Sequence, residues 1–421
     1  MKRIALICFV LAAFGINAAE MRIWKAATGS SEIEAVFLAT DGMAVTLKTS
    51  GGKEVTVPID KLCEADQAYL AEKGEELAVE AQQDRAPDNL PYAMGKIVGP
   101  IEAGSDAHYL LYLPTTLRKG REAPLLFYTH AGGGDGKLLS VIKEGAELTG
   151  WVMAISMESK NNRDSGKNLK SSEDAVEHIL ETLPVAEDRL YFTGNSGGAA
   201  EAFRNCDHLD GCGVMPNIGY IPSGTSPPKG DAFIINGASD FNRYTSANAR
   251  KRIGDTAVHR FHAAGHRRAP DWLMVDGMLW LEGRYLAREA KNEQEQLNEY
   301  VRTVLKLIGD LKKYEPYRAY YWALFLKEEM PLSGAQIKRV DDLVDELGQE
   351  QANRLFVEGL RALDELSEEY LADFGGGSTM NYLDSTLASD CEDLLKHYSG
   401  VPVIEETLRE MMKETAALKG H

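Results

Sequence analysis

A serine set between glycines, at the junction of an apolar run and a helix-compatible run, most constrains the fold of this chain. The segment Arg189–Ala200 reads RLYFTGNSGGAA and contains G-x-S-x-G at Gly194–Gly198. The run before it predicts a short buried strand, and the small residues after it predict a helix. A serine on such a sharp turn has a strained backbone and an exposed hydroxyl at the positive end of a helix. The segment therefore predicts a nucleophile, Ser196, at the carboxyl edge of a sheet.

Strands and helices alternate around this segment, from Met94 to Arg288. Because several of the predicted strands are apolar on both faces, the pattern indicates a buried, mostly parallel sheet wound with helices, the α/β class. The polar run Lys160–Lys170 is expected to be a loop, either solvated or at the edge of a substrate cleft. The predicted strands are 108–113, 124–129, 151–157, 189–193, 213–218, 232–236 and 257–262, and the predicted helices are 172–183, 197–205, 242–253 and 271–288.

The first residues have the layout of a secretory signal peptide. Met1–Ala19 carries Lys2 and Arg3, then an apolar run, then small residues. The apolar run is too short to span a bilayer comfortably, so we expect cleavage rather than a retained anchor, and no later segment is apolar enough to span a membrane. The mature protein is therefore expected to be exported, either periplasmic or secreted.

The charge of the chain excludes some partners. The formal net charge is −18, and loss of Lys2 and Arg3 takes it to −20. Such an acidic chain is a poor ligand for nucleic acid or for an anionic membrane surface. Among the remaining cysteines, Cys206 and Cys212 have two open interpretations, a disulfide in an exported protein or two free thiols. The sequence contains no zinc-type cysteine and histidine spacing, and we expect no metal or cofactor.

A small β module precedes the alternating region. Alternation predicts strands at 22–25, 32–40, 43–49 and 54–58, followed by a short helix at 64–73, which favours an SH3-like barrel over residues 20–74. The segment resembles the SLA1 homology domain 1 family, and this resemblance implies an interaction module with an unknown protein ligand. The residues that carry it are Arg22-x-Trp24, Val45-Thr46-Leu47, Val55-Thr56-Val57-Pro58 and Lys61-Leu62-x-x-x-Asp66-Gln67-x-Tyr69-Leu70.

Two regions without recognisable chemistry complete the chain. Residues 75–93 are polar and Gln-rich, as expected of a linker between the module and an α/β domain at 94–288. Residues 289–421 show helical spacing with charged outer faces and no fixed repeat, which predicts an all-helical region. This region is either a helical cap or bundle, or a docking or dimerisation surface. The predicted helices are 292–326, 334–347, 351–374, 381–398 and 402–418.

Partners for the serine follow later strands. A serine nucleophile needs a base, and the base needs a carboxylate that orients it. Asp240 follows the predicted strand 232–236, and His266 follows the strand 257–262. The order Ser196, Asp240, His266 is that of an α/β-hydrolase, and each interval leaves room for one helix and one strand.

Other residues compete for these roles. Asp231 and Asp255 are alternatives for the acid, although neither follows a strand end. His259 and His262 are alternatives for the base, but both fall inside a predicted strand, where a packed environment is expected. Further residues are expected to be structural or at the surface, namely His130, His178, His208, Trp272 and Trp280.

A glycine-rich loop supplies the remaining part of the site. The sequence His130-Ala131-Gly132-Gly133-Gly134 follows a predicted strand and resembles the H-G-G-G type of oxyanion loop. We expect one backbone donor at Ala131 or Gly132 and another at Gly197, directly after the nucleophile. With this loop, residues 94–288 resemble the α/β-hydrolase family, in particular compact carboxylesterases and enzymes that cleave polyesters or feruloyl esters.

The resemblance implies roles for Ser196 as nucleophile, Asp240 as orienting acid and His266 as base. Asn195 departs from the His, Tyr or Phe that often precedes the nucleophile in that family. The leading hypothesis is a serine esterase acting on a small or carbohydrate-linked ester without a cofactor. Two alternatives stay open, a serine peptidase of the same fold and an exported binding or scaffold protein that retains the fold without turnover.

Overall fold

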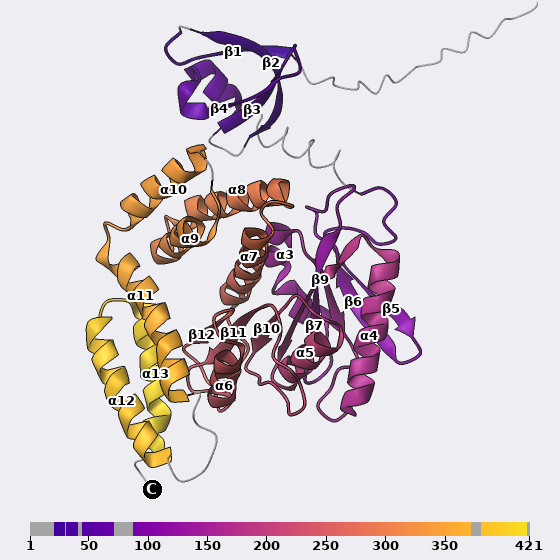
Figure 1. Ribbon diagram of the computed structural model, residues 1–421, viewed down its shortest axis with the longest axis vertical. Helices are drawn as coiled ribbons and strands as arrows, with labels where there is room; N and C mark the ends of the chain where they lie inside the picture. The colour runs from indigo at the N-terminus through magenta and orange to yellow at the C-terminus, as the bar shows by residue number, and fades with distance from the viewer. Residues whose placement is uncertain are drawn as a thin grey trace, which may run out of the picture. The chain divides into compact units, whose positions relative to one another are not determined.

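The computed structural model describes residues 21–29, 31–40, 44–70, 87–332, 334–371 and 380–418. The chain divides into two compact units, with the boundary between residues 85 and 86 (Figure 1). The predicted signal peptide and most of the predicted linker lie outside the described residues. None of the helices in the described part is both long and apolar enough to cross a membrane.

The first unit contains a four-stranded antiparallel sheet in the order β1-β2-β3-β4. Its strands are β1 (Met21–Lys25), β2 (Glu32–Thr40), β3 (Ala44–Thr49) and β4 (Glu54–Pro58), followed by the 3-10 turn η1 (Ile59–Lys61) and helical residues at 64–70. The predicted β module is confirmed. Its core is formed by Trp24, Ala35, Val45, Leu47, Leu62 and Leu70.

The residues shared with the SLA1 homology domain 1 family stabilise this unit internally. The buried Trp24 donates its indole N–H to Ala35 O at 3.0 Å. Arg22 donates to Asp66 Oδ1 at 2.7 Å, and its guanidinium lies 4.0 Å from the centroid of the Tyr69 ring. Asp66 Oδ2 also accepts from the Lys25 N–H at 2.7 Å. These contacts tie the helical residues to β1, so the motif explains the fold of the module rather than its ligand.

The second unit is built on an eight-stranded sheet in the order β12-β11-β10-β9-β7-β8-β6-β5. Strands β7 to β12 are parallel to one another. The β5–β6 and β6–β8 pairs are antiparallel. This is the predicted α/β-hydrolase type of sheet. The strands are β5 (Ile97–Gly104), β6 (Ala107–Tyr112), β7 (Ala123–His130), β8 (Val152–Ser156), β9 (Val185–Asn195), β10 (Gly213–Asn217), β11 (Asp231–Gly237) and β12 (Ala257–His262).

Helices cover both faces of this sheet (Figure 1). On one face, α4 (Ser165–Thr182), α5 (Gly197–His208) and α6 (Arg243–Ile253) pack on alternate strand residues in one large apolar cluster. On the other face, α7 (Asp271–Arg288) places Trp280 against Phe233 of β11 and packs on α3 (Lys143–Thr149). The short helix α2 (Gly136–Ser140) follows the glycine-rich loop.

Two details of the sheet and its helices differ from the predictions. Strand β5 was not predicted, because Gly99 and Pro100 interrupt its pattern, and an edge strand tolerates a proline that a central strand would not. Helix α4 begins at Ser165, inside the predicted loop Lys160–Lys170, because Asp164 caps it by accepting from the Lys167 N–H at 3.1 Å.

The helical region consists of α8 (Gln294–Leu311), α9 (Pro316–Glu329), α10 (Gly334–Leu347), α11 (Gln351–Leu366), the π-helical turn η2 (Ser367–Leu371), α12 (Met380–His397) and α13 (Pro402–Leu418). The single helix predicted for 292–326 is two helices, because Pro316 lacks an N–H and starts α9. The residues on both sides of the predicted boundary at 288 belong to one compact unit.

This region covers the β12 edge of the sheet (Figure 1). The N–H of His259, on β12, donates to Asp364 Oδ1 of α11 at 2.8 Å, and its ring contacts Ser367 Oγ at 2.6 Å. Arg250 of α6 also donates to Asp364, at 3.2 Å. An edge strand presents unpaired backbone groups, so these contacts satisfy polar groups that would otherwise be buried without partners.

Candidate active site

Ser196 lies on a strained turn between β9 and α5. Its φ is 55° and its ψ is −121°, a conformation that non-glycine residues rarely adopt. The flanking glycines permit close contact of backbones. A Cβ at Gly194 would lie 2.3 Å from Gly198 O, and one at Gly198 would lie 2.3 Å from Thr129 O. The G-x-S-x-G pattern therefore has a steric cause at both glycine positions.

The structure brings Ser196, His266 and Asp240 together. Ser196 Oγ lies 2.9 Å from His266 Nε2, and His266 Nδ1 lies 3.0 Å from Asp240 Oδ1. Asp240 follows β11 and His266 follows β12, both at the carboxyl edge of the parallel strands. With Nδ1–H donated to the carboxylate, Nε2 is the free acceptor for the serine proton.

Asp240 has the surroundings of an orienting carboxylate. It is 0% exposed, and its Oδ1 also accepts from the Asn242 N–H at 2.7 Å. The Asp240 Oδ2 atom is buried without a hydrogen-bond partner among the described residues. The adjacent Ser239 donates to Glu410 Oε1 of α13 at 2.6 Å, so the helical region also holds the loop that carries the acid.

The competing residues have other partners. Asp231 lies at the start of β11, where Arg284 donates to it at 3.2 Å and Arg288 also binds it. His259 contacts Asn236 and Ser367 inside the protein. His262 is buried, and this burial lowers the pKa of its ring. Neither histidine contacts Ser196.

The remaining aromatic and histidine residues also lie outside this constellation. The His178 ring contacts the Tyr109 hydroxyl at 2.9 Å and is only half-exposed, whereas His208 contacts Glu173 at the surface. Trp280 is buried, as expected, and Arg318 lies over the Trp272 ring.

The structure distinguishes the two loop positions, Ala131 and Gly132, that were predicted as a backbone donor. The Gly132 N–H, a predicted oxyanion donor, is used by His130 Nδ1 at 3.1 Å. Gly133 and Gly134 donate to His130 O and Ser156 O. The side chain of His130 therefore shapes the loop. Among the described residues, the N–H groups of Ala131 and Gly197 have no protein acceptor, which leaves these two as backbone donors.

Asn195, which departs from the family pattern, lies in a buried polar network under the nucleophile. It donates to the Tyr128 hydroxyl at 2.7 Å and accepts from Asn217 Nδ2 at 2.9 Å. Burial raises the pKa of Tyr128 far above its ordinary value, so the phenol stays protonated. The Ser196 N–H donates to Asn217 O at 3.0 Å. The network holds the turn in place from below, which single-residue patterns could not reveal.

An exposed aromatic side chain lies over the base. Phe241 is 63% exposed, and its ring stacks on His266 at a centroid distance of 4.2 Å. Tyr220, which follows the turn after β10, is also exposed. Phe241 therefore adds exposed aromatic surface beside the base.

No disulfide joins the cysteines in the described part of the chain. Cys206 and Cys212 are free, and their Sγ atoms contact Gly211 O at 3.6 Å and the Tyr191 hydroxyl at 3.4 Å. The disulfide that the sequence left open is therefore not formed. Among the described residues, no group of three or more His, Cys, Asp or Glu side chains is arranged to hold a metal ion.

The sheet order, the strained serine and its hydrogen-bonded histidine and aspartate define an α/β-hydrolase-type unit. Residues 15–77 match the family model of SLA1 homology domain 1. A search of curated proteins found no match to the chain. The first unit thus matches the SLA1 homology domain 1 family model, whereas the class of the second unit rests on its own fold and geometry.

Several solved serine hydrolases and esterases are similar in structure at low identity. FphF, a fluorophosphonate-binding serine hydrolase of Staphylococcus aureus, is 11% identical with a TM-score of 0.36, covering 45% of this chain and 99% of that one. An esterase of Pyrobaculum calidifontis is 14% identical with a TM-score of 0.34, covering 48% and 85%. Est1E of Butyrivibrio proteoclasticus is 10% identical with a TM-score of 0.34, covering 44% and 96%.

Proposed function

We propose that this protein is an exported serine hydrolase, a carboxylesterase that cleaves small or carbohydrate-linked esters through an acyl-enzyme. The observation that carries the proposal is the hydrogen-bonded series of Ser196 Oγ, His266 and the buried Asp240, at 2.9 Å and 3.0 Å. Such a series activates a serine that is otherwise a weak nucleophile at neutral pH.

The residues suggest a two-step reaction. Ser196 Oγ attacks the ester carbonyl while His266 Nε2 takes its proton, and the carbonyl oxygen becomes an oxyanion near the Ala131 and Gly197 N–H groups. His266 then returns the proton to the leaving alcohol. In the second step His266 takes a proton from water, and the resulting hydroxide attacks the acyl carbon. The acid then leaves as His266 returns the proton to Ser196 Oγ.

A fluorophosphonate probe tests the class of the protein. We expect the mature wild-type protein to be labelled and Ser196→Ala to remain unlabelled, because the probe reacts with an activated serine. Thr193→Ser, which retains a buried hydroxyl near the turn, is a matched control and should be labelled like wild type. A wild-type protein that stays unlabelled at high probe concentration would favour the binding-protein alternative.

A substrate panel tests the ester assignment. Aryl acetates and feruloyl esters are expected to be cleaved with higher kcat/KM than peptide anilides. The reverse order would contradict the esterase proposal and favour the peptidase. Export is tested separately by the mass of the protein recovered outside the cytoplasm, where cleavage after Ala19 is expected.

A further inference from the structure

The third glycine of the serine turn has a different steric cause from the other two. A Cβ at Gly197 would lie 1.7 Å from Oδ1 and 2.7 Å from Cγ of Asn161, and the three nearest atoms all belong to that side chain. Gly194 and Gly198, in contrast, are limited by backbone atoms. The absent side chain at Gly197 thus leaves space for the carboxamide of Asn161, directly beside the residue that follows the nucleophile.

Asn161 is also hydrogen-bonded to the glycine-rich loop, which carries the other backbone donor. Its N–H donates to Ala131 O at 2.9 Å, and the preceding Lys160 forms an antiparallel bridge with Gly132. The backbone of Asn161 therefore lies on the glycine-rich loop while its side chain lies on Gly197. The two backbone donors of the site, Ala131 and Gly197, both contact this one residue.

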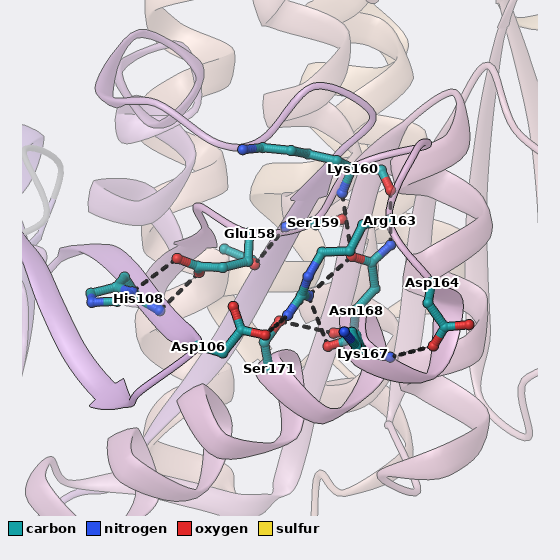
Figure 2. A network of polar contacts seen from close by, with 11 residues as sticks. Asp106, His108, Glu158, Ser159, Lys160, Arg163, Asp164, Lys167, Asn168 and Ser171 are labelled. Carbon is teal, nitrogen blue, oxygen red and sulfur yellow. Dashed lines mark hydrogen bonds and ion pairs between the residues drawn. The ribbon is translucent and has the colours of Figure 1, made fainter.

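Figure 2 shows polar contacts of Lys160 and Arg163, which lie on either side of Asn161 in the sequence. The buried Asn168 donates to Lys160 O at 3.0 Å and accepts from the Lys160 N–H at 3.4 Å. Arg163, two residues beyond Asn161, donates to Asp106 Oδ2 at 2.6 Å and to Asn168 Oδ1 at 3.2 Å. The backbone on both sides of Asn161 is therefore fixed, which limits the positions that its side chain can reach.

We propose that the carboxamide of Asn161 is a third hydrogen-bond donor to the oxyanion, beside the N–H groups of Ala131 and Gly197. This inference rests on the proposed function. The side chain of Asn161 has no hydrogen-bond partner among the described residues, and a carboxamide offers two N–H donors. Donors held in place where negative charge develops stabilise the transition state without reorganisation during the reaction.

Three variants test the proposal with p-nitrophenyl acetate as substrate. Asn161→Ala is expected to lower kcat by about 10²-fold with little change in KM, because the interaction forms only with the oxyanion. Asn161→Asp retains the shape but replaces the donor with an ionised acceptor, so a larger loss is expected. Asn162→Ala removes the same side chain from the next exposed position and is expected to retain the wild-type kcat.

A trifluoromethyl ketone provides a second readout. Ser196 Oγ adds to its carbonyl carbon, His266 takes the serine proton, and the ketone oxygen becomes an oxyanion. Affinity for this adduct is expected to fall in Asn161→Ala by the same factor as kcat/KM, because both report transition-state stabilisation.

The outcomes distinguish the inference from the proposed function. A wild-type protein without fluorophosphonate labelling would refute both. Labelling at Ser196 together with an unchanged kcat in Asn161→Ala would refute only the role of Asn161. A higher KM at unchanged kcat would assign Asn161 to ground-state binding and would also overturn the proposal.

Discussion

Acid is expected to destabilise the second unit through His259. This ring is fully buried between the sheet and the helical region, with Nε2 2.9 Å from Asn236 Oδ1 and Nδ1 2.6 Å from Ser367 Oγ. Burial, with Arg250 and Arg260 nearby, lowers the pKa of His259 to about 3. The folded protein therefore keeps this ring neutral at pH values where an unfolded chain protonates it.

The size of the effect follows from the two pKa values. An unfolded histidine has a pKa of about 6.5, so below that pH the unfolded state binds a proton that the folded state does not. The free energy of unfolding therefore falls as the pH falls, by up to about 1.4 kcal/mol per pH unit, until the folded ring is also protonated near pH 3. At about pH 5 the loss from His259 is about 2 kcal/mol.

Urea unfolding of wild type and His259→Gln measures this effect. Glutamine retains a donor and an acceptor but does not titrate. Between about pH 7 and pH 5, wild type is expected to lose about 2 kcal/mol more stability than His259→Gln, because all other groups titrate in both proteins. A difference below about 0.5 kcal/mol would refute the reasoning, since the buried ring would then accept a proton at little cost.

Three further predictions concern activity, the covered edge and the thiols. Asp240→Asn is expected to lower kcat by about 10⁴-fold in a steady-state ester assay with little change in the unfolding midpoint, because the amide no longer fixes the His266 tautomer; a small effect would exclude the orienting role. Asp364→Ala is expected to lower the free energy of unfolding in urea by about 2–4 kcal/mol, because it leaves the buried His259 N–H and Arg250 without this acceptor. Asp364→Asn retains an acceptor oxygen and should lower it less. Equal losses in the two variants would contradict this account. Burial raises the pKa of Cys206 to about 12 and also raises that of Cys212, so both thiols should react slowly with iodoacetamide until urea unfolds the chain; rapid labelling of the folded protein would contradict it.

Local patterns predicted the sheet and the positions of the main site residues. Ser196 is recognisable because its glycines and flanking apolar strand form one short segment. Asp240 and His266 are recognisable because each follows a strand, and the carboxyl ends of parallel strands meet at one edge. The acceptor of the Gly132 N–H, His130 Nδ1, was not predictable, since a histidine ring two residues away can adopt several rotamers.

Contacts between distant segments were not predictable. Asn161 lies in an exposed polar loop without a pattern, and only the three-dimensional structure places it against Gly197. Likewise, Asp364 and Glu410 resemble other surface carboxylates of an amphipathic helix, yet they accept hydrogen bonds from the sheet edge and from the loop beside Asp240. The sequence signal for this contact was Gly197 itself. The G-x-S-x-G pattern does not require a glycine at that position, so a glycine there indicates a close neighbour.

The backbone conformation of Ser196 lowers the stability of the fold at the residue whose hydroxyl is the candidate nucleophile. A glycine adopts its φ of 55° and ψ of −121° without the penalty that a Cβ incurs, which is about 1–3 kcal/mol for such conformations. Ser196→Gly is therefore expected to be inactive and to fold more stably than its parent. If the proposed hydrolysis were not needed, this one replacement would raise stability, so the serine at this position costs folding energy that only its reactivity would repay.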